Sequence, residues 1–199
     1  MKQYLLSIVI LLAYSCTGNM STDSIYTNDL QVPSHFMLKS SHDISLKNDM
    51  AFFKKGTYDG YLYQLYPNGK DTLSMEGYVN GHLSGCNKKW FSNKQLMEVR
   101  YYSKGKKNGK QIAYWPNGYK RFEFVAKDDS YEGELQEWSQ HGHLFHLANF
   151  VNGQEEGVQK MWYENGKIKA NYVIMSGKRY GLLGTKNCKN VSDSIFNVN

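Results

Sequence analysis

The chain has 199 residues, of which 41% are hydrophobic and 15% are aromatic, and its formal net charge is +6. With a mean hydropathy of −0.61, this composition indicates a soluble body and excludes a core built mainly from Leu and Ile. The 16 tyrosines fit a thin sheet, because a Tyr ring can pack while its hydroxyl stays in water.

A secretory signal peptide is predicted at residues 1–15. Met1-Lys2 precedes an apolar run from Leu5 to Leu12, and small residues follow it before Cys16. A run of about eight to ten apolar residues is too short to span a bilayer and is typical of an export signal. We therefore expect an exported protein of the cell envelope, on the periplasmic or cell-surface side of a membrane.

Cys16 is the candidate site of lipid attachment. A cysteine directly after a small residue resembles the lipobox of bacterial lipoproteins, which would make Cys16 the lipidated mature amino terminus. The usual Leu three positions before the cysteine is here Ala13, with Leu12 one place earlier. Ordinary cleavage after Ser15 is the alternative, because Ala13 and Ser15 are the small pair that this cleavage needs. Two or three acyl chains, at about 0.8 kcal/mol per buried methylene, would hold the protein on a membrane surface.

Two segments separate Cys16 from the main body. Residues 16–42 are polar and show no sustained period, so we expect a flexible tether. Residues 43–59 contain Ile44, Leu46, Phe52 and Phe53, which predict one or more strands. These strands would cap the first repeat, because a repetitive sheet otherwise exposes unpaired amides at its end.

An internal repeat dominates the rest of the chain. A glycine returns every 24 residues after a first interval of 25, at Gly60, Gly85, Gly109, Gly133, Gly157 and Gly181. A bulky residue follows five positions later, at Leu65, Trp90, Tyr114, Trp138 and Trp162. A turn pair comes next, clean in Asn68-Gly69, Asn117-Gly118 and Asn165-Gly166, and degraded in Asn93-Lys94 and His141-Gly142. The period predicts five units at 60–84, 85–108, 109–132, 133–156 and 157–180.

Each unit is predicted to be one β-hairpin. An Asn-Gly pair supplies two positive-φ positions for a tight two-residue turn, and the flanking stretches are rich in β-forming residues. Because an isolated hairpin is marginally stable, neighbours must stack, and the recurring rings would brace one another in a column. We expect an all-β fold, an elongated single-layer antiparallel meander of hairpins.

The unit resembles the variant MORN repeat of bacterial proteins often labelled YwqK-type antitoxins. The fifth unit matches best, with Gly157, Trp162, Asn165-Gly166, Gly177 and Gly181. The second unit departs at Asn93-Lys94, and the third has Asp128-Asp129 where an inter-unit glycine is expected. The resemblance implies a curled sheet of consecutive hairpins used for binding or scaffolding, and it does not imply a single activity.

Residues 181–199 are predicted to form a closing cap or tail. A disulfide between Cys86 and Cys188 is disfavoured, because about eight strands at roughly 4.8 Å each would separate them. Cys86 is expected to be a small packed side chain. Cys188 lies between lysines that would lower the pKa of a thiol, and its role stays open.

No catalytic, metal or cofactor site is predicted. His141, His143 and His146 surround one turn, but His143 and His146 fall on opposite sides of a strand, so we expect solvated side chains. Glu123, Glu132, Glu134 and Glu137 are also expected to face water. No nucleophile elbow or phosphate-binding glycine loop is found.

Two functions stay open. The first is a membrane-tethered module that binds a protein or an envelope polymer, and the second is an antitoxin or immunity-like protein, which the family label suggests. Basic turns such as Lys104 to Lys107 either protect sheet edges or attract an anionic partner. Nucleic acid is not expected as a partner of an exported protein. The candidate binding face is the ring column, which consists of Trp90, Tyr114, Trp138 and Trp162.

Overall fold

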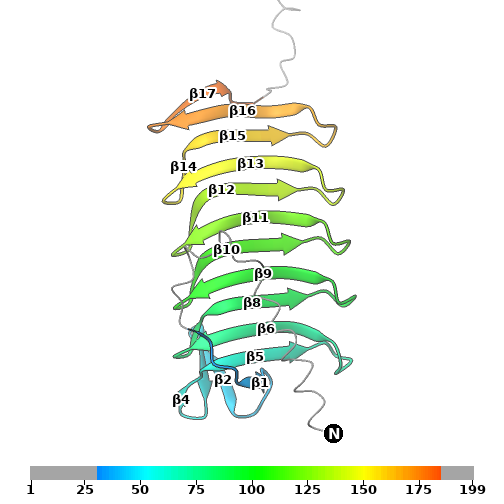
Figure 1. The fold of residues 1–199 in the computed structure, drawn as a ribbon, viewed down its shortest axis with the longest axis vertical. Coiled ribbons are helices and arrows are strands. Elements are labelled where there is room, and N and C mark those ends of the chain that lie inside the picture. The colour runs from blue at the N-terminus through cyan, green and yellow to red at the C-terminus, as the bar shows by residue number, and fades with distance from the viewer. Residues whose placement is uncertain (1–30, 185–199) are drawn as a thin grey trace, which may run out of the picture.

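The computed structural model describes residues 31–184, and this part of the chain is all-β without a helix. Its 17 strands form one open sheet in which consecutive strands pair in a meander (Figure 1). Every pairing is antiparallel except that of β1 with β5. The predicted fold class is therefore confirmed.

The long strands come in five hairpins, one for each predicted repeat, although β10 and β12 begin three residues before the predicted starts at Gly109 and Gly133. They are β5 (Gly60–Leu65) with β6 (Thr72–Val79), β8 (Gly85–Trp90) with β9 (Leu96–Ser103), β10 (Lys106–Tyr114) with β11 (Lys120–Lys127), β12 (Ser130–Trp138) with β13 (Leu144–Val151), and β15 (Gly157–Trp162) with β16 (Ile168–Met175). Short strands β7 (His82–Leu83) and β14 (Gln154–Glu155) lie between hairpins, and β17 (Lys178–Leu182) is the last described strand.

The amino-terminal strands cap the first hairpin. They are β1 (Phe36–Leu38), β2 (Ile44–Lys47), β3 (Met50–Phe53) and β4 (Gly56–Thr57). β1 extends the sheet beside β5, and Phe36 stacks on Tyr61 with ring centroids 5.2 Å apart. Because β1 lies within the range predicted as a tether, the ordered cap begins earlier than the sequence indicated.

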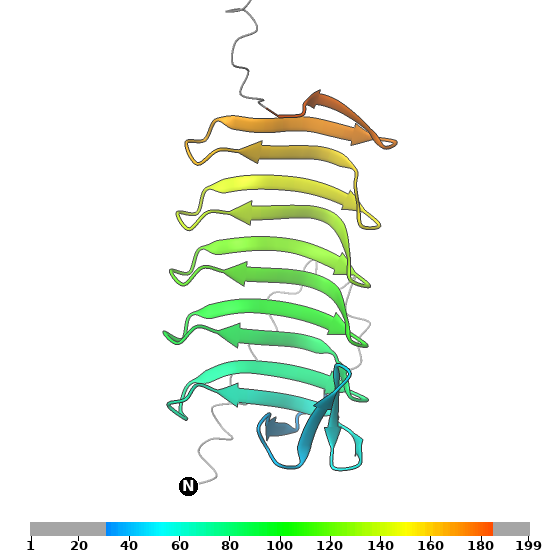
Figure 2. The same cartoon turned by 180° about the vertical axis from the view of Figure 1, so that it is seen from behind.

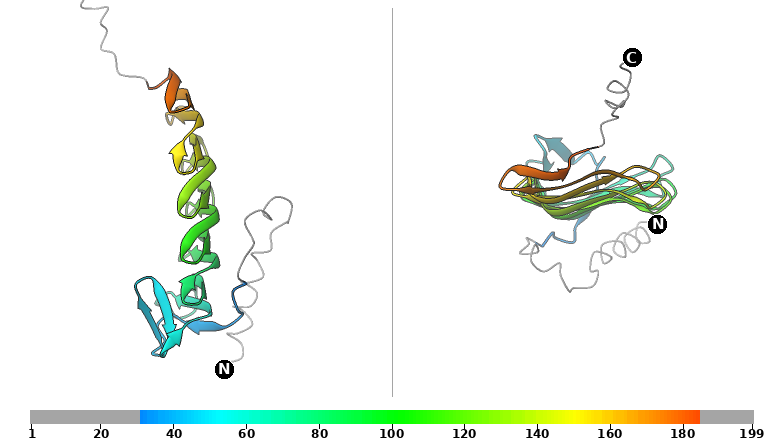
Figure 3. Two further views of the ribbon diagram at one scale, coloured as in Figure 1. Left: turned by 90° about the vertical axis from the view of Figure 1, so that its left-hand side faces the viewer. Right: turned by 90° about the horizontal axis from the view of Figure 1, so that it is seen from above.

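The hairpin β2–β3 stands against one face of the sheet, whereas the rest of the sheet is one layer thick (Figures 2 and 3). We call this face the hairpin face. It carries Glu76, Lys89, Arg100 and Phe124, because paired residues project to the same side. The other face, which we call the far face, carries Met75, Val99 and Ile112. The buried cluster lies under the cap, where Ala51, Tyr58, Leu62 and Tyr78 pack together.

Two turn types alternate along the sheet, and this corrects the predicted turn geometry. In Asn117-Gly118 only the glycine has positive φ, and Gly118 N donates to Trp115 O at 2.9 Å. This is a type I turn followed by a left-handed glycine, which is typical of a three-residue hairpin loop. The two-residue turns with positive φ at both positions join successive hairpins instead, as in Asn152-Gly153 and Asp128-Asp129.

The repeat glycines lie inside strands rather than at turns. Gly109 has a φ of 102°, and the β9–β10 register shifts between Lys107 and Gln111 around it. Gly133 has a φ of 70° at a similar shift between β11 and β12. Left-handed glycines at such shifts are the mark of β-bulges, which bend a strand. At Gly109 and Gly133 the 24-residue period therefore coincides with a bulge.

Candidate functional site

The predicted ring column lies on the far face. Glu123 pairs across the strands with Ile112 and therefore lies on the far face, and Lys120 forms an ion pair with it there. Lys120 Nζ lies 5.4 Å from the centre of the Trp138 ring, which places this ring on the same face. Trp90, Tyr114 and Trp162 occupy the same repeat position, and all four rings are half-buried. Successive members are two strands, about 9.6 Å, apart, which exceeds the 4.5–7 Å range of ring contacts. Within residues 31–184, no ring contact joins two of them, so the predicted mutual bracing is wrong.

The rings at the next repeat position connect the units instead. The Tyr66 hydroxyl donates to Trp90 O at 2.8 Å, and Trp115 Nε1 donates to Trp138 O at 2.9 Å. The turn asparagine adds a second link, because Asn117 Nδ2 donates to Gln140 O at 2.7 Å. A polar ring six residues after the repeat glycine, present at Tyr66, Trp115 and Tyr163, was the sequence signal for these links.

Several glutamates predicted to face water have defined partners. Glu132, directly before a repeat glycine, accepts a hydrogen bond from Asn152 N at 2.9 Å, and Asp59 and Glu156 occupy the same position before their glycines. Glu137 Oε2 lies 2.7 Å from His146 Nδ1. Glu134 is exposed, as expected. These carboxylates hold turns and strands together.

The histidines do not converge. His141 and His143 have ring centroids 6.5 Å apart, and His146 turns to Glu137. In the part of the chain that the structure describes, no group of three His, Cys, Asp or Glu side chains is placed to hold a metal ion.

An open groove of about 450 Å³ lies on the hairpin face, between the hairpin tip and the sheet. Leu46 to Asp49 form one wall. The floor consists of Glu76 and Tyr78 from β6, Asn87 and Lys89 from β8, and Glu98, Arg100 and Tyr102 from β9. The repeat pattern gave no sign of this groove, because the cap folds back over strands whose lining residues lie up to 56 residues later in the chain, from Leu46 to Tyr102.

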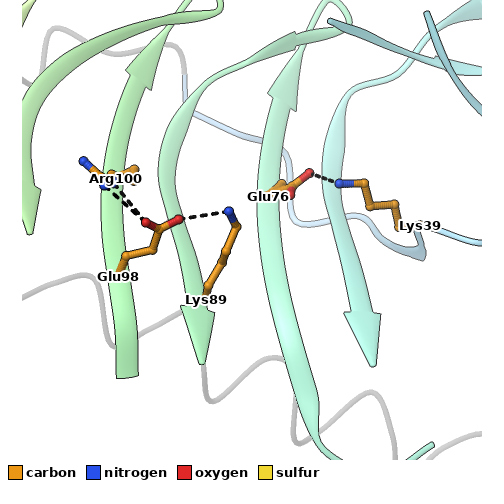
Figure 4. Close-up of polar contacts among 5 residues, drawn as sticks. All are labelled: Lys39, Glu76, Lys89, Glu98 and Arg100. Carbon is orange, nitrogen blue, oxygen red and sulfur yellow. Dashed lines mark hydrogen bonds and ion pairs between the residues drawn. The ribbon is translucent and has the colours of Figure 1, made fainter. Parts of the chain in front are cut away.

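Charged side chains in the groove form two networks (Figure 4). Lys39 Nζ lies 2.7 Å from Glu76 Oε2, which also accepts a hydrogen bond from the Tyr78 hydroxyl at 2.9 Å. Glu98 is shared by two cations, with Lys89 Nζ at 3.0 Å and Arg100 Nη2 at 3.2 Å. Burial raises the pKa of Glu98, but the hydrogen bonds and charges of Lys89 and Arg100 outweigh it and hold that pKa below its ordinary value.

An aromatic stripe continues from the groove along the hairpin face. It consists of Phe122, Phe124, Tyr131 and Phe150. The Arg100 guanidinium lies 4.7 Å from the Phe122 ring centre, Phe124 lies 4.7 Å from Tyr131, and Tyr131 stacks on Phe150 at 4.9 Å. These rings occupy different positions in their units, so a fixed repeat offset could not reveal the stripe. Tyr131 is 39% exposed, which leaves the stripe open to solvent.

A second, shallow hollow of about 700 Å³ lies near the loop ends of the last two hairpins. Phe145, Trp162 and Tyr163 line it, together with His143 and Lys169. Trp162, a member of the predicted ring column, borders this hollow.

Cys86 is buried at 8% exposure and is disulfide-bonded. It is packed as expected, but its bonded state corrects the expectation of a simple packed side chain. Cys16 and Cys188 lie outside the described residues, as do the signal peptide and most of the predicted tail. Between residues 31 and 184, no helix has the length and apolarity needed to cross a membrane.

No protein-family model and no curated protein matches the chain. The similarity to variant MORN repeats therefore rests on the sequence pattern alone.

Proposed function

We propose that this chain is a non-enzymatic interaction module of the bacterial cell envelope, built from variant MORN-like repeats and tethered to a membrane through Cys16. The open hairpin face, where a groove continues into an exposed aromatic stripe, is the observation that supports binding. A single-layer sheet presents long surfaces to a partner, whereas catalysis usually requires an enclosed pocket.

The disulfide at Cys86 supports export, because disulfides persist in oxidising compartments. The disulfide also provides a test of the lipid tether, because lipid on the Cys16 sulfur excludes a Cys16–Cys86 bond. Cys188 does not reach Cys86 within one chain, since eight strand spacings from β8 to β17 span roughly 38 Å and the four residues after Gly184 span at most about 14 Å.

Secretion with cleavage after Ser15 is a second candidate for the amino terminus, compatible with the bonded state of Cys86. In that case the thiol of Cys16 stays available to Cys86. In the lipidated form, the disulfide of Cys86 would instead join two chains. Both candidates place the repeats outside the cytoplasm.

Mass spectrometry of the mature protein without reduction separates these candidates. A tethered protein carries acyl chains on Cys16, and the Cys16→Ser variant moves from the membrane to the soluble fraction. An unmodified amino terminus with Cys16 linked to Cys86 would rule out the lipid anchor and leave the binding function untouched.

Site-resolved photocrosslinking in the native cell tests the binding function. A photoreactive residue at Phe124 on the hairpin face should give adducts of defined mass, and one at Ile112 on the far face should not. Equal labelling of both faces, or none, would contradict the proposal. A cross-linked protein whose toxicity is relieved by co-expression would instead assign the antitoxin role.

A further inference from the structure

We propose that the groove and the aromatic stripe form one docking surface for a polypeptide segment that carries isolated carboxylates beside aromatic or other bulky apolar side chains. This inference rests on the proposed binding function and deepens it by naming the class of partner.

Charge in the groove favours a carboxylate. Lys89 and Arg100 share the single carboxylate of Glu98, so two cations face one anion at that point. Arg100 directs Nε and Nη2 to the same oxygen of Glu98, at 3.3 and 3.2 Å. A guanidinium has five N–H donors, so Arg100 keeps donors for a second carboxylate.

The same groove disfavours a uniformly charged polymer. Asp49, Glu76 and Glu98 line it among the basic side chains. A nucleic acid or a polyanionic glycan would bring a negative charge against each of these carboxylates. A polypeptide differs because its carboxylates are separated by neutral residues, so it is able to place one acid against the remaining donors of Arg100 without a further charge beside Glu76 or Asp49.

Arg100 joins the polar groove to the apolar stripe. Its guanidinium contacts Glu98 on one side and lies 4.7 Å from Phe122 and 6.0 Å from Phe124 on the other. Arg and Tyr are the residue types that contribute most at protein interfaces. The exposed ring of Tyr131 on β12 and the half-buried rings on β11 and β13 offer contacts to bulky side chains of a segment that crosses the strands.

A matched pair of arginines provides the control. Arg179, near the other end of the sheet, also pairs with a glutamate, Glu155 at 3.2 Å, and lies 5.5 Å from an aromatic ring, that of Tyr172. It lies outside both the groove and the stripe. Substituting Arg179 tests whether an arginine between a glutamate and an aromatic ring is sufficient for peptide binding, or whether binding also needs the groove.

The experiment pans the full exported chain against a displayed library of random 12-residue peptides and then measures the affinity of selected synthetic peptides. Selected peptides should combine Asp or Glu with an aromatic residue. Arg100→Ala and Phe124→Ser should each weaken binding by at least tenfold, Lys89→Ala should weaken it less, and Arg179→Ala should change it by less than twofold. Raising the salt concentration should also weaken binding.

Circular dichroism melts separate binding from folding, and Lys89→Ala adds a variant at a half-exposed position. Selected peptides that bind Arg100→Ala as tightly as the wild-type chain would overturn the inference, as would heparin binding more tightly than any peptide. If the adducts formed at Phe124 in the cell resist protease, the partner is not a polypeptide. That outcome would overturn this inference and leave the proposed binding function standing.

Discussion

The two ends of the sheet use the same hairpin unit but bury very different amounts of it. At the capped end, Ala51 and Leu62 are fully buried, and Tyr58 and Tyr78 are 4% exposed. At the other end, the exposed apolar side chains include Val158, Ile168, Met175, Tyr180 and Leu182, at 37–53%. The backbone pairing is equivalent, so the difference comes from the second layer that the amino-terminal hairpin supplies.

This contrast indicates that the sheet is not uniformly stable. In a repeat array each unit contacts only its neighbours, and local opening begins where few apolar contacts form. The last hairpin buries Ala170 and Ile174, at 4% exposure, but it and β17 otherwise depend on backbone hydrogen bonds and on exposed contacts such as that of Arg179 with Tyr172. The groove, in contrast, is built on the buried end, where its side chains are held in fixed positions.

The largest expected effect tests the buried end directly. Leu62→Ala removes a fully buried side chain and should cost about 2–5 kcal/mol of unfolding free energy. Ile168→Ala is the matched change at the other end, where the side chain is 48% exposed, and it should cost less than about 1 kcal/mol. Urea denaturation measures both, and equal losses would remove the distinction between the two ends.

Glycine substitutions sharpen the same contrast. Gly60 has a φ of +136°, and a Cβ there would lie 2.6 Å from His35 O in the cap. Gly133, in the uncovered part of the sheet, has a φ of +70°, and a Cβ there would meet no atom within 4 Å. Gly133→Ala should therefore cost only the strain of the left-handed conformation, about 1–2 kcal/mol, and Gly60→Ala should cost more. Thermal melts that rank the two variants in the opposite order would show that the cap does not enclose Gly60.

The hairpin units were predictable because their signals are local. A glycine every 24 residues and Asn-Gly pairs between β-forming stretches give the number and order of hairpins. The predicted turn type was wrong because Asn and Gly are favoured both in three-residue hairpin loops and in two-residue turns. Asp128-Asp129 shows the ambiguity, since it adopts the positive-φ pair without any glycine.

The groove and the stripe were not predictable from the repeat, because they depend on contacts between distant segments. Leu46 and Arg100 line one groove only because the cap folds across the sheet. Phe124 and Tyr131 meet because the register shift at Gly133 brings them together. The predicted ring column failed on distance, since equivalent positions in successive units are two strands apart.

The links between units should have a smaller effect than burial. Tyr66→Phe removes the hydrogen bond to Trp90 O and should cost about 0.5–1.5 kcal/mol, with faster amide exchange where β6 meets β8. Tyr180→Phe, at a site that is 51% exposed in β17, is the control and should change stability little. If both variants behave alike, the side-chain links contribute nothing beyond the backbone pairing.

The smallest expected effect is electrostatic and concerns the capped end. Because Lys89 and Arg100 hold the pKa of Glu98 below its ordinary value, the native state binds its proton less readily than the unfolded chain does. The stabilisation by Glu98 is therefore present above the unfolded pKa, near pH 4.5, and is lost as the pH falls through the lower native pKa. Glu98→Gln should lower stability at pH 7 by less than about 1 kcal/mol, and the gap to wild type should close toward pH 3. Denaturation series at pH 7, 5, 4 and 3 measure this gap, and a gap that stays constant would mean that Glu98 stabilises the groove through shape rather than through charge.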